Sequence, residues 1–169
     1  MPLKILNSKH DLFKTKLDLD KIGVFGMSMG GIASTEVCLK DKRIKACINI
    51  DGGLCTSAID RKIQTPFMFL NSKRFLGYGH LFTSSSITDC YSLSVKNSDH
   101  YNFTDYSIYP YPPTERFMGT IDGNKTIEIM NTMVLAFFDK YLKEREDIDL
   151  IKEANKYSEI EIATNIDQK

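Results

Sequence analysis

Five residues near the start of the chain, Gly26-Met27-Ser28-Met29-Gly30, have the types and spacing that hold a reactive serine. They follow an apolar stretch and precede small residues that suit a helix, which is the context of a G-x-S-x-G nucleophile elbow. On so sharp a turn the serine has strained backbone angles, and the two flanking glycines remove side chains that would clash. We therefore expect the Ser28 hydroxyl to stand clear of the sheet. We expect the Met29 backbone N–H to face a developing oxyanion.

The pentapeptide alone is a weak signal, because glycine and serine are common residues. One alternative is a glycine-rich turn from strand to helix with no chemistry. Another is a phosphate cradle, but no Walker lysine follows Gly30-Gly31 and the chain contains no G-x-G-x-x-G. The apolar segment before the turn and the small residues after it favour the nucleophile.

A nucleophilic serine needs a base within hydrogen-bond reach, and the chain offers three histidines. His10 precedes the first expected strand, and His80 lies in a segment whose pattern is ambiguous. His100 lies five residues beyond the fourth expected strand, at its carboxyl end. We predict His100 as the base and keep His80 as a lesser candidate; the alternative for His100 is a surface loop histidine.

The acid that orients the base should also follow a strand. Asp51 directly follows the second expected strand, so topology favours it. Asp89 stands before a strand, at the wrong end of the sheet, and Asp60 sits farther along a loop. Asp99 adjoins His100, and neighbouring side chains usually diverge. The alternative for the chosen aspartate is a turn residue, because it opens an Asp-Gly-Gly sequence.

Alternating apolar and helical patterns predict the elements that position these residues. A three-layer α/β fold with a parallel sheet follows from that alternation, and its sites form at the carboxyl ends of the strands. Residues 157–163 suit either a short strand or a mobile segment. The expected strands are 21–26, 44–50, 66–70 and 91–95, and the expected helices are 5–14, 29–40, 79–89 and about 125–144.

Composition excludes several classes of function. The 169 residues carry 22 basic and 22 acidic side chains, so no net positive charge points to nucleic acid. No apolar run approaches the ~18 residues of a membrane span. The cysteines show no metal-like spacing, and we predict no cofactor or metal. We expect all four to be free thiols, which favours a reducing, cytoplasmic compartment: Cys38, Cys47, Cys55 and Cys90.

Several segments together resemble the type II platelet-activating-factor acetylhydrolase group and its bacterial lipase-like relatives. The resemblance covers about residues 15–145 and implies an α/β-hydrolase fold, calcium-independent ester hydrolysis, and a triad on Ser28, Asp51 and His100. The family usually has His and Phe where this chain has Met27 and Met29. A dienelactone-hydrolase-like enzyme would want cysteine at position 28. The matching segments are 26–31, 48–52, 66–72, 98–105, 119–123 and 134–142.

Only 20 residues precede Lys21, whereas a complete α/β-hydrolase has about four strands before its elbow strand. We therefore expect residues 1–145 to be the C-terminal part of such a catalytic domain, without the N-terminal strands, and residues 146–169 to be a charged tail. The elbow strand would then be an exposed sheet edge, through which the chain could associate with itself.

These observations predict a serine esterase or lipase-type hydrolase acting on a small-molecule or lipid ester, either short-acyl esters or phospholipid acetyl esters. The alternative is a catalytically impaired α/β-hydrolase fragment that acts as a binding or assembly partner. The short segment before the elbow favours that alternative.

Overall fold

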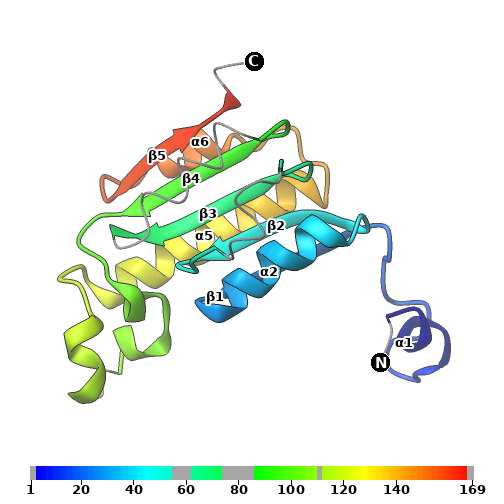
Figure 1. Cartoon of the computed structure of the whole chain (residues 1–169), viewed down its shortest axis with the longest axis horizontal. Helices are drawn as coiled ribbons and strands as arrows, with labels where there is room; N and C mark the ends of the chain where they lie inside the picture. The colour runs from blue at the N-terminus through cyan, green and yellow to red at the C-terminus, as the bar shows by residue number, and fades with distance from the viewer. Residues whose placement is uncertain (1–2, 55–61, 74–85, 110–111, 167–169) are drawn as a thin grey trace.

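A five-stranded sheet forms the centre of the computed structural model, which describes residues 3–54, 62–73, 86–109 and 112–166 (Figure 1). The first four strands are parallel, and the last is antiparallel to its neighbour. The sequence predicted the first four within two residues at each end. In sheet order the strands are β1 (Ile22–Met27), β2 (Ile44–Ile50), β3 (Phe67–Ser72), β4 (Cys90–Val95) and β5 (Ile160–Thr164).

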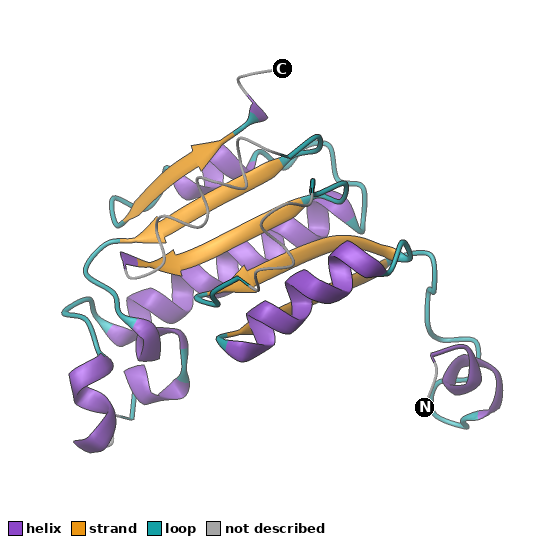
Figure 2. Cartoon of the chain, in the orientation of Figure 1, coloured by secondary structure: helices purple, strands orange, loops and turns teal. Residues whose placement is uncertain are grey.

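Helices cover both faces of this sheet, which gives the expected three layers (Figure 2). Helix α2 (Met29–Lys40) lies on one face, where Cys38 packs with buried residues of β2 and β3. Helices α5 (Gly123–Tyr141) and α6 (Leu150–Ala154) lie on the other. The fold class predicted from the sequence is confirmed.

Strand β3 shows why the central strands read as continuous apolar runs. Phe67 and Phe69 are fully buried in the cluster beneath α2. Met68 and Leu70 are fully buried in the opposite cluster, beneath α5. Successive side chains point to opposite faces, so a strand covered on both sides is apolar along most of its length. In β3 the exceptions are Asn71 and Ser72, at its carboxyl end.

Helix α5 anchors the second layer. Its buried positions Ile129, Met133 and Phe137 recur every four residues, which aligns them on one face. The Asp122 side chain accepts a hydrogen bond from the Lys125 N–H at 2.9 Å and caps the first turn. The cap sets the start of the helix two residues before the predicted start, and the helix ends three residues before the predicted end.

Among the described residues, three short 3-10 helices lie between β4 and α5, and none of them was predicted from the sequence. They gather beyond the carboxyl end of the sheet (Figure 1). In chain order they are η2 (His100–Phe103), η3 (Asp105–Ser107) and η4 (Pro112–Phe117).

The ends of the chain differ from the expected boundaries. Helix α1 (Leu3–Lys9) stops five residues short of the predicted 5–14 helix, and turns follow it. The stretch 146–169, set apart in the sequence as a charged tail, supplies α6 and strand β5, which pairs with β4. The helix expected over 79–89 lies outside the described residues up to position 85, and residues 86–89 are not helical.

Strand β1 stands at one end of the strand order, so the elbow strand is an edge strand of the described sheet, as predicted. Cys38, Cys47 and Cys90 are buried and unbridged, while Cys55 lies outside the described residues. Within the described ranges, every helix is too short or too polar to cross a membrane.

Candidate active site

Ser28 occupies the turn between β1 and α2, where the sequence placed it. Its φ of 56° and ψ of −121° are a strained conformation for a residue with a side chain. Its N–H donates to the carbonyl oxygen of Ile50 at 2.9 Å, which ties the turn to the end of β2. The side chain is only partly buried, so the hydroxyl can meet a substrate.

The positions at which this turn requires a glycine differ from the predicted ones. A Cβ at Gly26 would overlap the backbone of Gly30, so the first glycine is needed as expected. A Cβ at Gly30 would meet open space, so the expectation that its own side chain would clash is wrong. The second tight position is Gly31, where a Cβ would overlap the side-chain oxygen of Asn49 on β2.

Asp51 follows β2 and also has a positive φ, 46°, a conformation that aspartate tolerates better than most residues. The side chain is fully buried. Its Oδ1 accepts a hydrogen bond from the Ser72 N–H at 2.6 Å, and its own N–H donates to the Leu70 carbonyl at 2.9 Å. Strand β3 therefore holds the carboxylate in one orientation.

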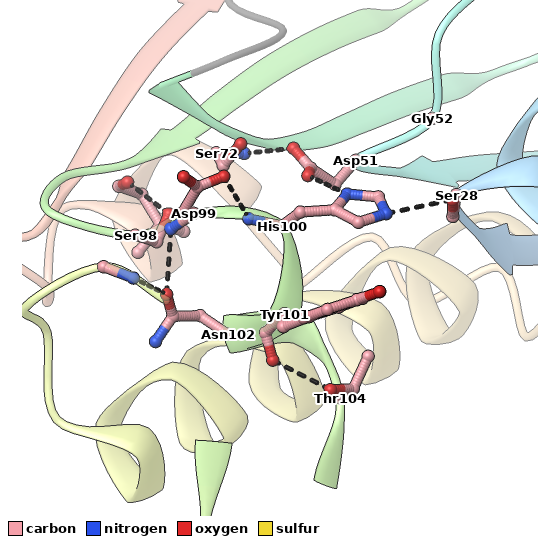
Figure 3. Close-up of polar contacts among 12 residues, drawn as sticks. Ser28, Asp51, Gly52, Ser72, Ser98, Asp99, His100, Tyr101, Asn102 and Thr104 are labelled. Atoms are coloured by element: carbon pink, nitrogen blue, oxygen red, sulfur yellow. Dashed lines mark hydrogen bonds and ion pairs between the residues drawn. The ribbon is translucent and has the colours of Figure 1, made fainter. Parts of the chain in front are cut away.

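His100 lies between the other two residues, so the structure brings together all three predicted side chains (Figure 3). Its Nδ1 is 2.6 Å from Asp51 Oδ2, and its Nε2 is 3.0 Å from Ser28 Oγ. Because an ionised carboxylate only accepts hydrogen bonds, Nδ1 carries the proton and Nε2 accepts from the serine hydroxyl. The imidazole is oriented to take a proton from Ser28.

The other acids and bases that the sequence offers lie away from this site or outside the described residues. Asp89 precedes β4, at the amino end of the sheet, and accepts from the Tyr141 hydroxyl. Asp99 caps η2 by accepting from the His100 N–H at 2.6 Å. The ring of His10 accepts from the Leu12 N–H in the N-terminal segment. Asp60 and His80 lie outside the described residues.

Asn102 supports the loop that carries His100, a role that was not predicted from the sequence. This fully buried side chain accepts from the Asp99 N–H at 2.8 Å and from the Gly119 N–H at 2.6 Å. The first of these bonds belongs to a capping box formed with Asp99. The spacing of Asp99 and Asn102, three residues apart on either side of His100, is the sequence signal that could have predicted this capping box.

Met29 is the first residue of α2, where helix N–H groups have no partner inside the helix. The residue is 80% exposed. The positive end of the helix dipole adds to the attraction for a developing negative charge at this N–H. As for metals, no group of three or more potential ligands occurs among the described residues.

Comparisons with known proteins place the chain in a family. The family model for platelet-activating factor acetylhydrolase, isoform II, matches residues 1–161. Platelet-activating factor acetylhydrolase from Gallus gallus is 30% identical over 159 residues, and that from Canis lupus familiaris is 32% identical over 165. These matches cover 87% and 88% of this chain but 38% and 36% of the relatives, so the chain spans little more than a third of their length.

A solved structure also shares the fold. The ferulic acid esterase from Streptomyces cinnamoneus superposes with a TM-score of 0.75 at 24% identity, over 86% of this chain and 47% of the esterase. At that identity the likeness concerns the fold alone, and it agrees with the parallel sheet and its helical layers. The family match over residues 1–161 goes further: this chain belongs to the platelet-activating factor acetylhydrolase isoform II family.

Proposed function

We propose that this chain acts as a serine hydrolase of carboxylic esters, with Ser28 as nucleophile, His100 as general base and Asp51 as the orienting acid. The supporting observation is the continuous hydrogen-bonded chain from a buried carboxylate through an imidazole to a hydroxyl on a strained turn. Nucleophile, base and orienting group in hydrogen-bond contact are what covalent acyl transfer requires.

In the first half of the reaction, Ser28 Oγ attacks the acyl carbonyl carbon while its proton moves to His100 Nε2. The carbonyl oxygen gains negative charge and accepts a hydrogen bond from the Met29 N–H. The tetrahedral intermediate then collapses, the bond to the alcohol oxygen breaks, and the proton on Nε2 passes to the departing alcohol. Asp51 stabilises the imidazolium throughout without taking its proton.

In the second half, water attacks the acyl-enzyme carbonyl and gives its proton to His100 Nε2. The bond to Oγ breaks, the proton returns to Ser28, and the carboxylic acid leaves. No step requires a metal or an organic cofactor. The names of the relatives suggest the substrate class, so we propose short-acyl esters, including acetyl esters of phospholipids, as substrates.

The test is hydrolysis of p-nitrophenyl acetate by the full chain, with Ser28→Ala as the inactive variant. Ser158→Ala is the matched control, because that serine is exposed and lies in the turn before β5. We expect slow turnover that is lost only in Ser28→Ala, labelling of Ser28 by a fluorophosphonate, and no response to EDTA. Turnover that survives Ser28→Ala would rule out this mechanism.

A second candidate function is assembly through the edge strand β1. Phe25 on this strand is 58% exposed, and its ring packs edge-on against that of Phe138 with the centroids 5.9 Å apart. An apolar edge strand is a template for pairing with another strand. If the chain self-associates here, sedimentation should detect oligomers that Phe25→Lys dissociates, while Val37→Lys, at a half-exposed position on α2, leaves them intact. Monomers at all concentrations would contradict this function.

A further inference from the structure

Tyr101, the residue after the proposed base, is placed to contact the substrate, and the mechanism above gives it no role. Its ring centroid lies 5.6 Å from that of His100, with the ring planes 40° apart. The two side chains extend in the same direction, and the Tyr101 hydroxyl points to the side on which Ser28 stands (Figure 3).

The ring is held in place by its neighbours. Tyr106 on η3 and Phe117 on η4 pack edge-on against it, with centroids 5.8 Å and 5.4 Å away. Its backbone carbonyl accepts hydrogen bonds from the N–H and hydroxyl of Thr104, at 3.2 Å and 2.8 Å. Edge-to-face packing of this kind is favourable for aromatic pairs, so the wall beside the imidazole is preformed.

The hydroxyl of this residue is available to a ligand. Tyr101 is only partly buried, and within the described part of the chain its hydroxyl makes no hydrogen bond. A tyrosine with an apolar ring packed on one side and a free hydroxyl can offer a substrate both an apolar surface and a donor.

Reaction geometry decides which part of the ester meets this wall. The departing alcohol must receive its proton from His100 Nε2, so it leaves on the imidazole side of the tetrahedral intermediate. The acyl oxygen points the other way, toward the N–H at the start of α2. A ring packed beside the imidazole therefore borders the alcohol and not the acyl group.

We propose that Tyr101 is a specificity-determining residue for the alcohol part of the ester. Its ring packs against that alcohol, and its hydroxyl donates a hydrogen bond to an acceptor oxygen close to the ester bond. Ethers and esters of glycerol and of phosphorylated glycerol carry such oxygens, whereas simple alkyl esters do not. This inference rests on the proposed function and adds to it the residue that recognises the alcohol part of the substrate.

The experiment compares two acetates of equal length in the full chain and its variants. One is 1,3-dimethoxypropan-2-yl acetate, a glycerol derivative with an ether oxygen on each side of the ester. The other is heptan-4-yl acetate, in which CH₂ groups replace the two ether oxygens. Tyr101→Phe should lower kcat/KM about threefold to tenfold for the ether substrate and leave the alkyl substrate unchanged. Tyr101→Ala should weaken both by about tenfold, mainly through KM.

Tyr109→Phe is the matched control, because this tyrosine is 76% exposed and is not part of the aromatic cluster around Tyr101. A merely structural role for Tyr101 would change both substrates equally, so the ratio of the two kcat/KM values is the decisive readout. An unchanged ratio in Tyr101→Phe, with Ser28-dependent turnover intact, would overturn this proposal and leave the proposed function standing. Absence of any Ser28-dependent turnover would overturn both.

Discussion

Each end of the sheet carries three side chains joined in a row by hydrogen bonds, and the two rows differ in kind. At the carboxyl end is the serine, histidine and aspartate of the candidate active site, which we call the site chain. At the amino end the Tyr91 and Tyr141 hydroxyls lie 2.9 Å apart, and Tyr141 donates to Asp89 at 2.9 Å. We call this second set the phenol chain. Both sets end in a carboxylate, so hydrogen bonding alone does not distinguish them.

Backbone conformation is the first difference. Ser28 and Asp51 both have a positive φ, whereas none of the three phenol-chain residues does. Strain of this kind costs of order 1–3 kcal/mol per residue and persists only where the surroundings enforce it. Here the surroundings are hydrogen bonds to the ends of β2 and β3, and the strain brings the two side chains to one imidazole.

Proton exchange is the second difference. Burial raises the pKa of Tyr91 to about 12, and burial is also the largest cause of a still higher pKa at Tyr141. Both phenols therefore stay protonated at neutral pH, and their chain contains no side chain of a type that ordinarily exchanges a proton near neutrality. The site chain contains an imidazole, the side-chain type that ordinarily gains and loses protons near neutrality. Three aligned partners become a candidate catalyst only when one of them can move a proton.

The largest expected effect separates the two chains by activity. Removing the nucleophile of a complete serine-hydrolase site costs about 10⁶-fold in kcat, so Ser28→Ala should reduce ester hydrolysis to background. Tyr91→Phe removes a hydroxyl from the phenol chain and should leave the rate unchanged. Steady-state rates with p-nitrophenyl acetate measure both. A large loss of rate in Tyr91→Phe would show that the phenol chain also takes part in catalysis.

Substituting the carboxylate of each set tests the difference between the two sets further. Asp51→Asn keeps the shape of the side chain but offers the imidazole the wrong hydrogen-bonding partner, and should lower kcat by about 10⁴-fold. Asp89→Asn should cost about 1 kcal/mol of folding stability at most and no activity. Paired kinetics and urea unfolding of the two variants test this, and equal losses of activity would contradict it.

The parts of this comparison that rest on topology were predictable from the sequence. Apolar runs located the four parallel strands, and the rule that sites form at carboxyl strand ends selected Asp51 over Asp89. The same rule selected His100, five residues past β4. These predictions needed only the period of the apolar pattern and the chain order of the polar residues.

The supporting contacts were not predictable, because they join residues distant in sequence. Asn102 meets the Gly119 N–H, 17 residues away, and Asp51 meets the Ser72 N–H, 21 residues away. The different roles of the elbow glycines depend on the position of the Asn49 side chain on β2. Such details follow from how the layers pack, and a one-dimensional pattern does not contain them.

A smaller effect should follow from loosening the loop that holds the base. Asn102→Ala removes the acceptor for the Asp99 and Gly119 N–H groups, so His100 should drift and kcat should fall by about 10- to 100-fold. Asn102→Asp keeps the acceptor oxygen and replaces the NH₂ group, which has no partner among the described residues, by a second carboxyl oxygen at the cost of burying an acidic group. It should retain more activity than the alanine variant. Equal rates in the two variants would show that the acceptor oxygen does not position the histidine.

The smallest effect concerns stability at alkaline pH and belongs to the phenol chain. The folded state holds the Tyr91 proton up to a pKa of about 12, while an unfolded tyrosine releases it near the ordinary value of 10. The contribution of this phenol to stability is therefore complete below pH 10. As pH rises from 10 to 12 it is lost, at no more than about 1.4 kcal/mol per pH unit for each phenol. Urea unfolding at several pH values should show this decline, and Tyr141→Phe should make it shallower by removing one of the two titrating groups. The exposed Tyr109→Phe should leave the slope unchanged. If Tyr141→Phe follows the same pH profile as the unmodified chain, the alkaline decline arises elsewhere in the molecule.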